Sequence, residues 1–301
     1  MDKEIQKPWP IRSLLFVPAN REDFVLKTIR FKPQAVILDL EDAVPRHELE
    51  KTRTQIKKLI QLLHEANILP FVRINSLDEG GLDDLPFVVC KNLQGIMVPK
   101  IESSKDTLLI DQTLLELEKK ESVPPGSIDI IALPETALGI YQGFEIANAS
   151  SRVKSLMTGV SGPIGGDIAK SVGFEATHEG LEQLYVQSKI VLDSQAANAP
   201  FPIAGIIGMN IKDLDFVRAL IERAKTIGFT GVALIHPTHV EIANQVFSMS
   251  DEDITFHKGL IKAFIEANQK GMGATTYEGS MIDQAMYERS ISILKAQGKY
   301  E

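Results

Sequence analysis

Eight short apolar runs, separated by longer and more polar stretches, constrain the fold of this chain more than any other feature of its sequence. The runs are Ser13–Val17, Ala35–Leu40, Phe71–Ile74, Gly95–Val98, Ile128–Leu133, Leu156–Thr158, Ile203–Ile207 and Gly231–Ile235. They are apolar at successive positions and do not alternate with polar residues. This is typical of parallel strands that are covered on both faces.

Stretches with helical periodicity lie between these runs. They include Leu26–Phe31, Glu50–Glu65, Thr107–Glu121, Tyr141–Asn148, Gly180–Ala197 and Lys212–Ile227. Eight strands that alternate with helices predict an α/β fold of the TIM (β/α)8 barrel type, with a doubly wound open sheet as the alternative. The length of 301 residues fits one such barrel or two average domains and does not decide between them. We expect the barrel to occupy residues 1–240.

The chain continues beyond the eighth run, and a barrel does not need this tail. Residues 251–271 and 284–297 have the pattern of helices, whereas the Gly- and Thr-rich segment 271–283 has weak periodicity. Residues 241–301 are therefore predicted to form a C-terminal helical extension, or lid, that packs on its own barrel or on a neighbouring subunit.

Composition and charge exclude several classes of function. The net charge of −8 and the lack of a basic cluster argue against binding to nucleic acid. No apolar run approaches the roughly 20 residues needed to cross a membrane, and the N-terminal segment lacks the pattern of a secretory signal. Cys90, the single cysteine, lies in an apolar, helix-like stretch and is predicted to be buried and inert. We expect a cytoplasmic protein.

Polar residues follow most of the apolar runs, at the end of a barrel where active sites lie. Those that follow the runs are Asn20, Arg21, Glu41, Asp42, Arg73, Asn75, Lys100, Glu102, Glu135, Asp167, Asn210, His236 and Pro237. Glu135 and Asp167 end neighbouring strands, and two carboxylates with water and substrate oxygens are a common Mg²⁺ site. The spacing of the histidines does not favour zinc. The glycine-rich segment 161–166 fits an anion cradle or a tight turn.

Seven segments, in this order, resemble those of a known family. They are RSLLFVPANRED, AVILDLEDAVP, VRINSLD, VPKIES, LPETALGIYQGFEIANAS, IHPTHVE and GSMIDQAMYERS, between about residues 11 and 295. They are similar to segments of the citrate lyase β-subunit family in the HpcH/HpaI aldolase superfamily. That family includes stand-alone malyl-CoA and citramalyl-CoA lyases. The resemblance implies a TIM barrel with a C-terminal extension, assembled as a homotrimer or hexamer.

The resemblance also implies roles for individual residues. Glu135 and Asp167 would hold Mg²⁺, and Arg73 would bind an oxygen at the reacting carbon. Asp283 would reach into the neighbouring subunit's site as an acid or base. The implied substrate and CoA contacts are Phe16, Asn20, Arg21, Lys27, Arg73, Ile235, His236 and Pro237, supported by Glu41, Asp42 and Lys100.

The implied activity is Mg²⁺-dependent cleavage, or formation, of a 3-hydroxyacyl-CoA such as citramalyl-CoA or malyl-CoA. The products would be a 2-keto acid (pyruvate or glyoxylate) and acetyl-CoA, with CoA entering as part of the substrate. Three alternatives stay open. They are a citrate lyase β subunit acting on a carrier-bound citryl thioester, an aldolase for a free hydroxy-keto acid, and a non-catalytic metabolite-binding member of the family.

One segment departs from the family pattern. Members usually pass directly from the sixth strand to the metal-binding aspartate, as in FGAED. Here the sequence MTGVSGPIGGD places several extra residues between Gly159 and Asp167, and Gly166 replaces the usual glutamate. Pro134 before Glu135 is a smaller departure. We expect the loop at 160–166 to be remodelled beside the metal and to affect the choice of substrate.

Overall fold

The computed structural model describes residues 8–296 and 298–300 and contains the predicted closed barrel. Its eight strands are parallel and lie in sequence order around the barrel, with β8 pairing with β1 to close it. The strands are β1 Ser13–Pro18, β2 Ala35–Asp39, β3 Leu69–Arg73, β4 Gly95–Pro99, β5 Asp129–Leu133, β6 Val153–Ser161, β7 Ile203–Ile207 and β8 Gly231–Leu234. All eight overlap the apolar runs, although β6 extends beyond its run at both ends, so the barrel predicted from the sequence is confirmed and the open sheet is not.

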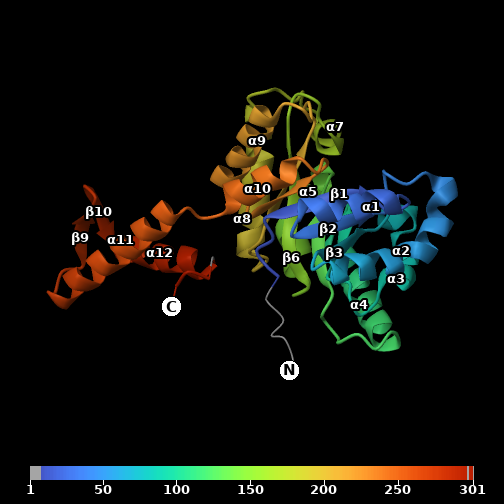
Figure 1. Cartoon of the computed structure of the whole chain (residues 1–301), viewed down its shortest axis with the longest axis horizontal. Helices are drawn as coiled ribbons and strands as arrows, with labels where there is room; N and C mark the ends of the chain where they lie inside the picture. Colours follow the sequence, from blue (N-terminus) through green and yellow to red (C-terminus); the bar gives the residue numbers. More distant parts are fainter. Residues whose placement is uncertain (1–7, 297, 301) are drawn as a thin grey trace. The chain divides into compact units, whose positions relative to one another are not determined.

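Helices cover the outside of the barrel. In Figure 1, α2, α3 and α4 lie on one side of the strands and α8, α9 and α10 on the other. The helices of this unit are α1 Glu22–Thr28, α2 Leu49–Glu65, α3 Gly81–Val88, α4 Ser104–Lys120, α5 Ala137–Tyr141, α6 Gly143–Asn148, α7 Asp167–Val172, α8 Leu184–Ala196, α9 Leu214–Ile227 and α10 His239–Phe247, with short 3₁₀ turns at Ile29–Phe31, Arg46–Glu48, Leu77–Glu79 and Leu181–Gln183. None of the described helices is long and apolar enough to span a membrane.

The core has two layers, which explains why the strands are apolar at successive positions. Within β2, Ile37 packs inside the barrel, whereas Val36 and Leu38 pack between the strands and the helices. All three are fully buried. Each such aliphatic side chain contributes roughly 1.5–3 kcal/mol by its removal from water, and this burial stabilises both faces of every strand.

A second compact unit comprises Ser248–Glu301. It contains α11 Asp251–Gln269, an antiparallel hairpin of β9 Ala274–Tyr277 and β10 Ser280–Asp283, and α12 Gln284–Ala296. Phe264, Ile282 and Tyr287 belong to its small core, and the rings of Phe264 and Tyr287 stack with centroids 4.9 Å apart. The predicted end of the last helix, at Gln297, lies outside the described residues.

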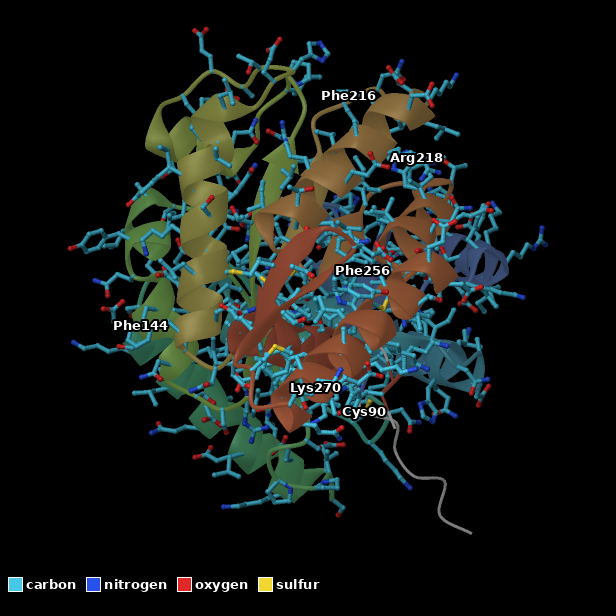
Figure 2. All side chains as sticks on the ribbon, turned by 90° about the vertical axis from the view of Figure 1, so that its left-hand side faces the viewer. Cys90, Phe144, Phe216, Arg218, Phe256 and Lys270 are labelled. Atoms are coloured by element: carbon cyan, nitrogen blue, oxygen red, sulfur yellow. The ribbon has the colours of Figure 1, made fainter. Side chains whose placement is uncertain are left out.

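Three sequence-based expectations need correction. The hairpin at 274–283 was not predicted. The division between the units falls after Phe247 and not after residue 240, because α10 runs through residue 240 and packs on β1, β8 and α9. Cys90, labelled in Figure 2, is partly exposed and follows α3 instead of lying within a helix, although burial still raises the pKa of its thiol.

Candidate functional site

A cavity of about 820 Å³ opens at the carboxyl ends of the barrel strands. One side of it is polar, with Asp39, Arg73 and Glu135 from β2, β3 and the end of β5. The other side is mostly apolar. The further described residues that line it include Phe16, Asp42, Leu133, Met157, Gly159, Ser161, Gly166, Asp167, Phe174, Gln183, Gly205, Ile207 and Ile235. The cavity lies where barrel enzymes hold their active sites.

Arg73 is the cationic centre of the polar side. Its Nε and Nη2 donate to the two carboxylate oxygens of Asp39 at 2.7 and 2.6 Å, and its Nη1 lies 2.9 Å from Glu41 and 3.2 Å from Asp42. Burial alone lowers the pKa of Arg73, but these carboxylates outweigh the burial and raise it. The guanidinium is therefore permanently charged and rigidly oriented, as a two-pronged contact requires.

Lys100 supplies a second cation beside the first. Its Nζ donates to Glu41 at 2.8 Å and lies 4.0 Å from Asp167. Its backbone is left-handed, with φ of 51°, directly after β4. This conformation is unfavourable for a residue with a β-carbon and is concentrated at functional sites. Lys100 thus joins the Arg73 cluster to the loop that carries Asp167.

Glu135 follows β5 and has no partner for its inner oxygen. The Oε2 atom is buried and forms no hydrogen bond with any described group. Burial, followed by the nearby charge of Glu41, raises the pKa of Glu135 to about 8; Asp167 adds to the shift, while Arg73 and Lys100 oppose it. A buried carboxylate that repels its neighbours is a group that a cation would stabilise.

Asp167 is the first residue of α7 and is half exposed, with 51% of its side chain accessible. Strand β6 runs on to Ser161, and the following loop continues the pairing, because Gly162 N–H donates to Ile207 O and Ile164 N–H to Gly208 O. The extra residues are thus an extension of the β6–β7 ladder that delivers Asp167 to the rim of the cavity.

Gln183 holds this extension in place through hydrogen bonds to Ser161. It is 3% exposed, accepts hydrogen bonds from the backbone N–H and hydroxyl of Ser161, and donates to Ser161 O at 3.1 Å. Arg223 also donates to Ser161 O, at 3.3 Å. The sequence analysis overlooked Gln183, and also Asp39, which it counted as strand interior. The aspartate within AVILDLED was the signal for the latter.

Several predicted contacts lie outside the cavity lining. Asn20 donates to Glu48 at 2.7 Å, and Arg21 and Lys27 both pair with Asp23, which keeps them around α1. After β8, Ile235 lines the cavity, whereas His236 pairs with a neighbouring threonine hydroxyl and Pro237 does not line it. Asp283 lies in the second unit, where it accepts a hydrogen bond from Met286 N–H at 3.2 Å.

The residues present fit a hard divalent cation. Among the described residues, no group of three or more His, Cys, Asp or Glu is arranged to hold a metal. The polar cluster nevertheless combines five carboxylates with only two cations, because Asp39, Glu41, Asp42, Glu135 and Asp167 surround Arg73 and Lys100. Two carboxylates, Glu135 and Asp167, with water and substrate oxygens meet the needs of Mg²⁺, and the inner oxygen of Glu135 has no hydrogen-bond partner among the described groups.

This barrel, with a carboxylate-rich cavity at its carboxyl end, has the architecture of a carbon–carbon lyase family. Residues 12–237 match the model of the HpcH/HpaI aldolase/citrate lyase family, and the chain belongs to that family. Its relatives include the citrate lyase subunit beta of Haemophilus influenzae, 32% identical over 94% of this chain and 96% of that one. Another is a (3S)-malyl-CoA thioesterase of Cereibacter sphaeroides, 31% identical over 91% and 90%.

Solved structures share the fold. A citrate lyase from Burkholderia xenovorans superposes with a TM-score of 0.78 at 19% identity, covering 95% of this chain and 92% of that one. The CitE protein of Mycobacterium tuberculosis, solved with magnesium, acetoacetate and coenzyme A, superposes with a TM-score of 0.70 at 23% identity, covering 95% and 97%. Both likenesses concern the fold alone.

Proposed function

We propose that this protein is a Mg²⁺-dependent lyase that cleaves a 3-hydroxyacyl-CoA, such as citramalyl-CoA or malyl-CoA, into a 2-keto acid and acetyl-CoA. The observation that carries the proposal is the unpaired, buried oxygen of Glu135, a residue that lines the cavity together with Asp167 and Arg73. The names of the relatives, a citrate lyase subunit and a malyl-CoA thioesterase, support acids and CoA thioesters as the substrate class.

Glu135 and Asp167 are the proposed ligands of the metal. Once bound there, Mg²⁺ would act as a Lewis acid on the hydroxyl and carboxylate of the carbon that becomes the keto carbon. Glu135 must lose its proton to serve, and its raised pKa of about 8 makes metal binding and deprotonation one coupled event. Lys100 holds Glu41 and faces Asp167, so it orients the second ligand.

Arg73 is the proposed partner of the oxygen at the reacting carbon. As the bond between that carbon and the adjacent CH₂ breaks, the hydroxyl oxygen gives its proton to solvent and becomes the keto oxygen, while the electron pair of the broken bond passes to the thioester as an enolate. A guanidinium already fixed by Asp39 does not reorient during this step, and preorganised donors of this kind contribute a few kcal/mol to transition-state stability. Asp39 is therefore a positioning residue.

The other product leaves as a thioester enolate and needs a proton. Asp283, delivered by the neighbouring subunit of a homotrimer or hexamer, is the proposed donor. In the condensing direction it removes the same proton from the methyl group of acetyl-CoA. General acid–base assistance of this type contributes roughly 10²–10⁴-fold to the rate.

The exposed surface around α1 is the proposed contact for the CoA moiety. Arg21 and Lys27 are exposed cations, and the Arg21 guanidinium stacks on the ring of Phe24 with its carbon 3.9 Å from the centroid. Cations beside an exposed aromatic ring suit the phosphates and base of a nucleotide. Asn20, His236 and Pro237 complete this proposed surface.

One assay separates these activities. Purified protein with Mg²⁺ is supplied with malyl-CoA and citramalyl-CoA, while keto acid and free thiol are measured separately. The lyase produces keto acid without free thiol, and a chelator stops it. A thioesterase, the activity that the Cereibacter relative's name indicates, would release the CoA thiol instead. Conversion of only a carrier-bound thioester would support a citrate lyase subunit, and tight binding without turnover a non-catalytic protein.

A further inference from the structure

The apolar side of the cavity is formed by alternate residues of β6 and β7. We call it the β6–β7 wall, and it consists of Met157, Gly159, Ser161, Gly205 and Ile207. Its one hydroxyl, on Ser161, is already hydrogen-bonded to Gln183 at 3.1 Å. The described residues of the wall therefore include no charged group, in contrast to the carboxylates and cations across the cavity.

One glycine of this wall, Gly159, leaves space for a ligand. A β-carbon added to Gly159 would meet only the Cδ1 atom of Ile207, at an ordinary 3.7 Å. A glycine inside a strand weakens the strand, and it often marks a point where a ligand approaches the backbone. Gly159 has no positive φ and is not a turn residue, so the fold itself does not require a glycine there.

The empty volume adjoins the proposed metal ligand. Gly166 immediately precedes Asp167, and a β-carbon on Gly166 would lie 3.1 Å from the same Ile207 methyl that faces Gly159. A group held at Asp167 and Glu135 therefore has this wall as its neighbour. Leu133 and Met157, each 4% exposed, close the inner end of the cavity. The CoA half of a substrate is too large for that closed end and must extend through the mouth.

We infer that the β6–β7 wall is a subsite for an apolar substituent on the acid half of the substrate, and that this substituent is an alkyl group larger than methyl. The inference rests on the proposed lyase function and specifies its substrate. Lys170, the one lysine among the described lining residues, is exposed on α7 and is not part of the wall. A second carboxylate, as in oxaloacetate, would therefore meet no charged group in the wall itself, and burying a charge without a partner is strongly unfavourable. The wall thus selects against citryl thioesters.

The test is a condensation series at fixed Mg²⁺ and acetyl-CoA. The keto acids are pyruvate, 2-ketobutyrate, 2-ketovalerate and oxaloacetate. We expect kcat/KM to rise with alkyl length, by about 10-fold or more per methylene where the fit is good, and to be lowest for oxaloacetate. A maximum at pyruvate or oxaloacetate would overturn the inference while leaving the lyase function intact.

Calorimetric binding of the same keto acids to the Mg²⁺-loaded protein separates the two proposals. If no keto acid condenses but its affinity still rises with alkyl length, the subsite is supported and the lyase function is contradicted. Equal affinities for all four, or strongest binding of oxaloacetate, would remove the subsite.

Substitution of Gly159 tests the location. Gly159→Val fills the space and should lower kcat/KM for 2-ketovalerate by about 10-fold or more relative to pyruvate, mainly through KM. Gly159→Ala adds one methyl group at normal contact distance and should give a smaller shift in the same direction. It serves as the test if the valine variant does not fold. Ser151→Ala, exposed in the turn that precedes β6, is the control. An unchanged ranking in both glycine variants would contradict the assignment.

Discussion

At the scale of single residues, the site is governed by an excess of negative charge. Arg73 is occupied by Asp39, Glu41 and Asp42, so little of its charge remains for Glu135. The result is a carboxyl group whose pKa rises to about 8. Below pH 4.5, its ordinary value, Glu135 is protonated in both folded and unfolded protein and has no effect on stability. Between pH 4.5 and 8 its ionisation increasingly favours the unfolded chain.

Glu135→Gln should therefore stabilise the metal-free protein at high pH. Because glutamine cannot ionise, we expect a gain of up to about 5 kcal/mol at pH 9. The gain disappears near pH 4.5, where Glu135 is protonated in both the folded and the unfolded chain. The same variant should lose Mg²⁺ binding, so Mg²⁺ should raise the Tm of the unmodified protein only. Scanning calorimetry from pH 5 to 9, with and without Mg²⁺, measures both effects.

The matched control is Glu145→Gln, an exposed glutamate on α6 outside the cavity lining. Its Tm should change little with pH relative to the unmodified protein, and its Mg²⁺ response should persist. If Glu135→Gln still binds Mg²⁺ normally, Glu135 is not a ligand.

At the scale of secondary-structure elements, the sequence predicted what burial determines. The eight strands were found because both of their faces are covered, which leaves a continuous apolar signal. The hairpin at 274–283 was missed because its side chains are largely exposed and carry little periodicity. A two-residue turn at Glu278–Gly279, with φ of 46° and 82°, was its available signal. Helix α3 carries Pro86, which obscures helical periodicity.

The site residues also divide into those whose position the sequence predicted and those whose position it did not. Arg73 ends β3 and Glu135 follows β5, so the barrel itself brings these two residues to one cavity, whereas Asp167 begins α7 after the loop that follows β6. The route of the loop before Asp167 depends on hydrogen bonds between Ser161 and Gln183, which precedes α8 and lies 22 residues further along the chain, and no local sequence pattern indicates such bonds. The ladder extension beyond Thr158 was therefore not predictable from residues 157–167 alone.

Gln183→Leu tests this element. Removing the amide leaves the buried N–H and carbonyl of Ser161 with fewer partners, which should lower stability by roughly 1–3 kcal/mol. It should also weaken Mg²⁺ binding, because the segment that delivers Asp167 is no longer fixed. Calorimetric titration with Mg²⁺ at a temperature where the variant stays folded measures the affinity. Gln195→Leu, an exposed position on α8, the helix that follows Gln183, is the control. Lower stability with an unchanged Mg²⁺ affinity would show that Gln183 only supports the fold.

At the scale of the whole molecule, the two compact units separate the proposed metal site from the proposed proton donor. Glu135 and Asp167 belong to the unit that ends at Phe247, and Asp283 belongs to the unit that begins at Ser248. Under the proposed function, a complete site would need both units, supplied by different subunits of one oligomer. That assignment came from the family resemblance, since composition and periodicity carry no information on which subunit supplies a residue.

Complementation between two inactive variants tests the shared site. Asp283→Asn should fold and bind Mg²⁺ but lose most turnover. Glu135→Gln should lose turnover because it no longer binds Mg²⁺. When the two variants are co-expressed in equal amounts, a site is active if its barrel comes from an Asp283→Asn chain, which keeps Glu135, and its second unit comes from a Glu135→Gln chain, which keeps Asp283. Random assembly of a cyclic oligomer makes about one quarter of the sites active, so we expect about one quarter of the unmodified rate. If each chain completed its own site, the mixture would stay inactive although mixed oligomers are seen by native mass spectrometry. Near-normal activity of Asp283→Asn alone would remove its proton-transfer role. Recovery in the mixture, measured with the keto acid assay, therefore distinguishes a site built by two subunits from one built within a single chain.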